Sequence, residues 1–131
     1  MNPFNARLTL TLGALALSVA AGSAQAASLL ALGSDGQLFK IDSSSLKVTA
    51  KMAAQSPVAL RGIDVRPANG QLYALGSDNQ LYTLDLASGA AKMAAKLNNS
   101  LPGAGQAVVD FNPVADRLRL LGPDGTSFRV N

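Results

Sequence analysis

The sequence predicts an all-β protein built from repeats, because a phrase recurs, turns are regularly spaced and side chains alternate between two faces. The phrase ALGSDGQLFKID at residues 31–42 returns as ALGSDNQLYTLD at 74–85 and, more weakly, as LLGPDGTSFRVN at 120–131. The first two copies agree at eight of twelve positions. Offsets of 43 and then 46 residues are typical of four-stranded propeller blades. We therefore expect antiparallel β-propeller-like repeats of about 43–46 residues.

Each copy of the phrase contains an aspartate followed by a residue that tolerates a positive φ angle, between two apolar runs. This pattern indicates a tight β-hairpin, because Gly and Asn adopt positive φ at low cost. The three pairs are Asp35-Gly36, Asp78-Asn79 and Asp124-Gly125. Turn-forming residues also recur at roughly ten-residue spacing, which is typical of consecutive antiparallel strands.

Alternation within the expected strands defines two faces of each sheet. Phe39 and Ile41 share one face of the strand that follows the first hairpin turn, and Lys40 lies on the other. The segment 72–75 is apolar on both faces, which predicts a strand covered on both sides. Residues 90–97 consist of helix formers, yet their place in the repeat predicts an outer strand.

Counting strands gives an incomplete set of about two and a half blades. The first repeat lacks its inner strand and the third lacks its outer strand. A closed propeller typically needs at least four blades, so the sheets are expected to keep open edges. Such edges are templates for self-association or for pairing with a protein partner. The alternative is a truncated gene product with no function of its own.

Residues 1–26 are predicted to be a secretory signal peptide, leaving a partial propeller-like repeat domain at 27–131. Arg7 is the only charged residue of this segment, an apolar run follows, and Ala24-Gln25-Ala26 supplies the small residues of a cleavage site. We expect a periplasmic or secreted protein with no membrane association after cleavage.

Composition excludes several classes of chemistry. The chain has no Cys, His or Trp, and all of its acidic residues are Asp. It therefore has no thiolate nucleophile, and it lacks the commonest general base and zinc ligand. The Lys and Arg residues are scattered among Asp residues, so no nucleic-acid footprint is visible. We expect no cofactor and no metal.

Five residues are candidates for ligand binding. Asp64 and Asp110 occupy matching inner strands, which line the central channel of a propeller. The alternative for both is a scaffold role in which the carboxylate ties down backbone N–H groups of a nearby turn or pairs with an arginine of a neighbouring repeat. Arg66, Arg117 and Arg119 are absent from the matching positions of the other repeat, so they are candidates for a patch that binds an anionic sugar or a carboxylate. The alternative for these arginines is ordinary scattered surface charge.

Three phrases resemble the exported bacterial family called domain of unknown function 4394. They are GIDVRPANGQ, LYALGSDNQLYTLDLASGAA and VVDFNPVADRLRLLGPDGTSFRVN, and the resemblance extends from about residue 29 to residue 131. It implies a propeller-like all-β fold, export, and no catalytic residues to transfer. Family members usually continue for roughly a hundred residues more, so the resemblance also implies a C-terminally truncated chain.

These observations predict an exported, non-catalytic binding or interaction module. The alternative is a propeller-type hydrolase. Such enzymes usually need a metal held by Glu or His, or a pair of carboxylates. Only Asp is available here, so the pair Asp64 and Asp110 is the sole carboxylate option among the matching inner strands.

Overall fold

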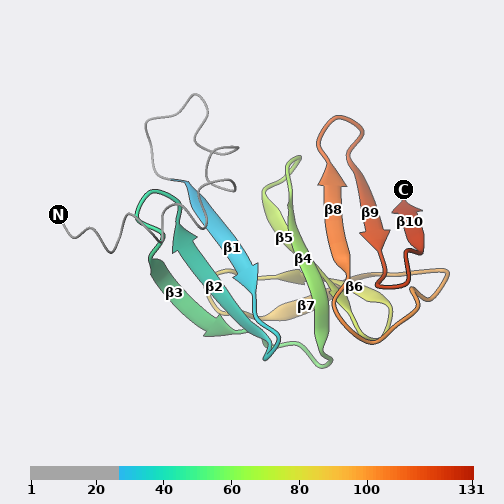
Figure 1. The fold of residues 1–131 in the computed structure, drawn as a ribbon, viewed down its shortest axis with the longest axis horizontal. Coiled ribbons are helices and arrows are strands. Elements are labelled where there is room, and N and C mark those ends of the chain that lie inside the picture. Colours follow the sequence, from blue (N-terminus) through green and yellow to red (C-terminus); the bar gives the residue numbers. More distant parts are fainter. Residues whose placement is uncertain (1–26) are drawn as a thin grey trace. The chain divides into compact units, whose positions relative to one another are not determined.

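The computed structural model describes residues 27–131 as antiparallel β-sheets, with no helix in that part of the chain (Figure 1). The all-β prediction is therefore confirmed. The predicted signal peptide, residues 1–26, lies outside the described residues. No helix within residues 27–131 is long and apolar enough to cross a membrane. The described residues divide into two compact units, residues 27–52 and residues 53–131.

The first unit contains one three-stranded antiparallel sheet with the order β1-β2-β3. Its strands are β1 (Ser28–Leu32), β2 (Gln37–Asp42) and β3 (Val48–Ala53). Asp42 closes the turn between β2 and β3, because one of its carboxylate oxygens accepts bonds from the backbone and hydroxyl groups of Ser44 and Ser45. These bonds, led by the Ser44 hydroxyl, lower the pKa of Asp42 to about 2.

The second unit contains two sheets, one of four strands in the order β4-β5-β6-β7 and one of three in the order β10-β9-β8. The four-stranded sheet consists of β4 (Leu60–Arg66), β5 (Gln71–Gly76), β6 (Gln80–Leu84) and β7 (Ala91–Lys96). The C-terminal sheet consists of β8 (Val108–Asn112), β9 (Arg117–Leu121) and β10 (Ser127–Val130). The edge strands β4 and β8 lie side by side (Figure 1).

All three predicted hairpin turns are present and share one geometry. In the first, the Gly36 N–H donates to the Gly33 carbonyl over 3.0 Å, and Gly36 has a φ of 78°. Asn79 and Gly125 make the equivalent bond, with φ angles of 59° and 87°. This is a β-turn followed by a left-handed residue, which explains why Gly or Asn follows each aspartate.

The main core of the second unit lies between its two sheets. Leu75 and Leu81 of the four-stranded sheet pack against apolar side chains of the C-terminal sheet, and Tyr73 packs edge-on against Phe111 at a centroid distance of 5.3 Å. The C-terminal sheet contributes its buried alternate positions: Val109, Phe111, Leu118 and Leu120. Leu101, from the connection between β7 and β8, completes the buried cluster.

The helix-prone segment forms strand β7, as its place in the repeat predicts. β7 pairs with β6 in the register Thr83 to Lys92 and Leu84 to Ala91. Most of its side chains are exposed. Pairing with a buried neighbouring strand thus overrides the local helix propensity of Ala, Met and Lys.

Candidate functional site

The exposed face of the C-terminal sheet gathers three arginine side chains. Strict alternation in β9 buries Leu118 and Leu120 and exposes Arg117 and Arg119. The same alternation in β10 turns Arg129 outward. We call the exposed face formed by Asp110, Asn112, Arg117, Arg119 and Arg129 the basic face.

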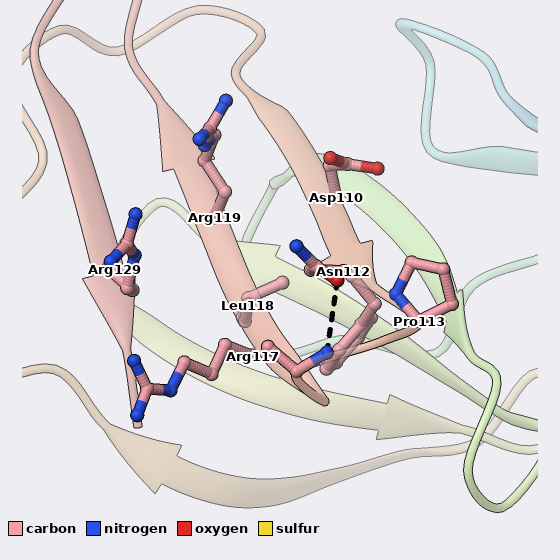
Figure 2. A pocket seen from close by; sticks show the side chains of 9 residues that line it. Asp110, Asn112, Pro113, Arg117, Leu118, Arg119 and Arg129 are labelled. Carbon is pink, nitrogen blue, oxygen red and sulfur yellow. Dashed lines mark hydrogen bonds between the residues drawn. The ribbon is translucent and has the colours of Figure 1, made fainter.

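Strand register brings these side chains together. Arg119 lies directly opposite Asp110 of β8 on one side and Arg129 of β10 on the other. Arg117 lies opposite Asn112. Figure 2 shows Arg119 and Arg129 extending in the same direction from neighbouring strands, while Arg117 extends from the start of β9 toward β10. Directly opposed residues on neighbouring strands have Cβ atoms about 5 Å apart, so one anionic ligand can reach more than one guanidinium group.

The basic face borders an open groove of about 360 Å³. Its wall on the β8 side is formed by Asp110, Asn112 and the turn residue Pro113. The three arginines form the rest of the polar lining (Figure 2). The groove therefore presents three fixed positive charges and one carboxylate to solvent.

None of the three arginines is held in an ion pair within residues 27–131, where the single ion pair joins Arg66 to Asp116. An exposed guanidinium group without an internal partner keeps all five N–H donors for solvent or a ligand. Its planar fork suits bidentate bonds to carboxylate, sulfate or phosphate groups. The basic face is thus chemically suited to bind an anion.

Asp64 has the scaffold role that the sequence left open. Its Oδ2 atom accepts a hydrogen bond from the Phe111 backbone N–H over 2.7 Å, and its Oδ1 atom accepts one from the Val65 N–H over 2.9 Å. Phe111 lies on β8, so Asp64 joins the edge strands of the two sheets. Both carboxylate oxygens are therefore engaged by the backbone.

Arg66 lies apart from the basic face, in a bidentate ion pair with Asp116. Its Nε atom donates to Asp116 Oδ1 over 2.8 Å, and its Nη2 atom donates to Oδ2. The bonds from Arg66 lower the pKa of Asp116, and the Asp116 carboxylate raises the pKa of Arg66. The pair joins the end of β4 to the turn between β8 and β9, so Arg66 has a structural partner.

Asp110 is the counterpart of Asp64 in the third repeat, but its surroundings differ. It lies on the exposed side of β8, at the rim of the groove, and accepts no hydrogen bond from residues 27–131. The structure thus brings Asp110, Arg117 and Arg119 together, as candidates on one face, and separates them from Asp64 and Arg66. No cluster of three or more acidic side chains that could hold a metal occurs in the described residues.

Arg129, Asn112 and Arg61 are residues that the sequence analysis did not single out. Arg129 could have been found from the alternation of Phe128 and Val130, which fixes it on the opposite face. Arg61 is only 3 % exposed, and its guanidinium group donates to the carbonyl oxygens of Leu101, Pro102 and Gly105. No local pattern reveals that role, because the carbonyls lie at least 40 positions away in the sequence.

The face of the four-stranded sheet that corresponds to the basic face is covered. At an offset of 46 residues, Tyr73 corresponds to Arg119, and Leu81 corresponds to Ser127. Tyr73 and Leu81 pack in the core, whereas Arg119 and Ser127 are exposed. Equivalent backbone positions therefore carry apolar side chains where the sheet is covered and polar ones where it faces solvent.

Comparison with known proteins names the family of the chain. The family model described as Domain of unknown function (DUF4394) matches residues 38–131. That range includes every strand from β4 to β10 and all residues of the basic face. No curated protein matches the chain. The chain belongs to the DUF4394 family.

Proposed function

We propose that the protein is an exported, non-catalytic binding module with propeller-like repeats, which binds an anionic ligand on its basic face. One observation carries the proposal: Arg117, Arg119 and Arg129 line one groove and have no internal ion-pair partner in the described chain. Exposed arginines on neighbouring strands repel one another. An anion that contacts two of them offsets this repulsion and gains a charge-assisted hydrogen bond to each guanidinium group.

The propeller-like part of the proposal is supported by the relation between the two sheets of the second unit. The edge strands β4 and β8 are neighbours and occupy the same place in successive repeats. Asp64 connects them through the Phe111 N–H. Successive sheets placed with their first strands together are expected for blades around a common axis.

The hydrogen bonds of Asp64 favour a binding function over the alternative, hydrolysis by the pair Asp64 and Asp110. A carboxylate pair for hydrolysis needs one group free to accept or donate a proton and a second free to act as base or nucleophile. Both oxygens of Asp64 accept backbone N–H groups, which fixes the carboxylate as a structural acceptor. The proposed module therefore uses Asp110 and the arginines for recognition.

Binding to a soluble polyanion tests the proposal. We expect purified protein to bind sodium polygalacturonate at low ionic strength, measured by isothermal titration calorimetry, and to bind less tightly as salt is added. A variant with Arg117→Gln, Arg119→Gln and Arg129→Gln should lose about 100-fold in affinity, because each exposed charge contact contributes about 1 kcal/mol.

A matched control separates the basic face from overall charge. Lys40→Gln, Lys47→Gln and Lys92→Gln remove the same number of positive charges at exposed positions elsewhere. The proposal requires this control to bind like the wild-type protein. Equal loss in both triple variants would mean that binding follows net charge, and the basic face would lose its role.

Export and self-association belong to the same proposal and have separate tests. Expression in a bacterial host followed by mass spectrometry of the periplasmic fraction should detect a chain that begins at Ala27. Recovery of the uncleaved chain in the cytoplasm would contradict export. Light scattering of the purified protein tests whether the open sheet edges pair two copies, with a discrete dimer as the expected result.

A further inference from the structure

Asp110 places one acceptor-only group in an otherwise cationic groove. It lies directly opposite Arg119 in the strand register and lines the same groove as all three arginines. The equivalent Asp64 accepts two backbone N–H groups, whereas Asp110 accepts none from the described residues. An ionised carboxylate accepts hydrogen bonds but donates none, so Asp110 needs donors from solvent or from a ligand.

This carboxylate restricts the kind of anion that fits. A polyanion without donors brings negative charge against Asp110 and gains only from the arginines. A ligand that carries hydroxyl groups beside its anionic groups satisfies the arginines and also donates to Asp110. The Asn112 side chain, which lies in the same groove, offers both a donor and an acceptor to such hydroxyl groups.

We infer that the ligand is an acidic polysaccharide, in which anionic groups bind the arginines and sugar hydroxyls donate to Asp110. This inference rests on the proposed function. An acidic peptide fits less well, because the N–H groups of an extended peptide alternate with carbonyl groups that place further acceptors beside Asp110. Hydroxyl groups rotate to suit their partner and occur on every sugar ring.

The spread of the arginines also favours an extended ligand. Arg117 and Arg119 are two positions apart on one strand, a separation of about 7 Å along the strand. Arg129 lies on the neighbouring strand opposite Arg119. An isolated anion reaches only part of this set, whereas a chain with repeated anionic groups contacts all three arginines in the open groove.

Two polycarboxylates that differ in hydroxyl content test the inference. Polygalacturonate and poly-L-glutamate both carry carboxylates, but only the polysaccharide carries hydroxyl groups. We expect the wild-type protein to bind polygalacturonate about tenfold more tightly at equal carboxylate concentration, the effect of one hydrogen bond to a charged group. Asp110→Ala should abolish that preference, because polygalacturonate then loses the hydrogen bond from its hydroxyl group to the carboxylate.

Two further variants serve as controls for Asp110→Ala. Asp85→Ala removes one exposed carboxylate outside the basic face and should keep the preference. Asp110→Asn keeps the shape of the side chain and should also reduce the preference, which excludes an effect of misfolding. Equal binding of both polymers, or a preference that survives both Asp110 variants, would overturn the inference but leave anion binding in place. Failure of both polymers to bind would overturn the proposed function itself.

Discussion

The covered face of the four-stranded sheet and the basic face of the C-terminal sheet share a backbone plan but differ in their side chains. Tyr73, on the covered face, packs against Phe111, whereas its counterpart Arg119 points into an open groove. Asp64 bonds to the next edge strand, whereas Asp110 accepts no such bond in the described chain. The two sheets thus keep the same backbone plan, and side chains that differ between them form the surface that we propose for recognition.

Gly62 and Val108 illustrate the difference most clearly. A Cβ atom at Gly62 would lie 2.8 Å from the Val109 Cγ2 atom and would also collide with the Ala107 carbonyl oxygen. The matching position in β8 is Val108, which is 52 % exposed. The covered side thus requires close approach of two strands, and the exposed side carries a branched side chain with no neighbour to collide with.

Of the variants considered, Gly62→Val should give the largest loss of stability, and the reverse substitution at the matching position, Val108→Gly, is its control. Gly62→Val is expected to destabilise the protein by about 3 kcal/mol, because the new side chain must displace backbone of the connection to β8. Val108→Gly should cost less than about 1 kcal/mol, the usual penalty of Gly in a strand. Urea denaturation measures both, and similar losses would contradict the proposed asymmetry.

Replacement of Arg61 should give the next largest loss of stability. Arg61→Ala removes donors from three carbonyl groups of the connection between β7 and β8, and should cost about 2 kcal/mol. Arg117→Ala is the matched control on the basic face and should change stability by less than about 0.5 kcal/mol. An Arg61 variant as stable as the Arg117 variant would show that these bonds contribute nothing net.

Substitutions of the two equivalent aspartates should affect different properties: stability for Asp64 and ligand preference for Asp110. Asp64→Ala leaves the Phe111 N–H without its acceptor and should cost about 1 kcal/mol. Asp110→Ala should leave the denaturation midpoint unchanged and alter ligand preference alone. Thermal denaturation and calorimetry on the same two variants check this, and equal thermal loss in both would remove the distinction between them.

The smallest effect is expected for the Arg66–Asp116 pair as the pH falls. The bonds from Arg66 lower the pKa of Asp116 below its ordinary value of 3.8. A carboxyl group whose pKa is lower in the folded state stabilises the fold above the unfolded pKa, and that contribution disappears as the pH falls. Between about pH 5 and about pH 3, wild-type protein should lose slightly more stability than Asp116→Asn. Identical losses would show that the exposed pair contributes nothing.

The sequence predicted the strands and turns well, because both follow local chemistry. The aspartate of each hairpin accepts the N–H two residues on, as in Asp35 with Gln37, so the turn is encoded within a few residues. The arrangement of the sheets depends on contacts between distant residues, such as Asp64 with Phe111, which no local pattern records.

The candidate site was predicted in part for the same reason. Arg117 and Arg119 departed from the repeat and were recognised, and strand alternation places them together. Arg66 also departed from the repeat, but its partner Asp116 lies 50 positions away and could not be inferred locally. Arg129 was missed because it joins the site through pairing between β9 and β10, although the register follows from the hairpin turn.

NMR mapping of the ligand-binding residues is the sharpest test of whether the basic face is the recognition surface. Polygalacturonate would be titrated into isotope-labelled protein while backbone amide and arginine side-chain signals are recorded. We expect saturable shifts confined to β8, β9 and β10, centred on Arg119 and absent in the triple arginine variant. Shifts centred on the covered sheet or on the first unit, or no shifts at saturating polymer, would contradict it.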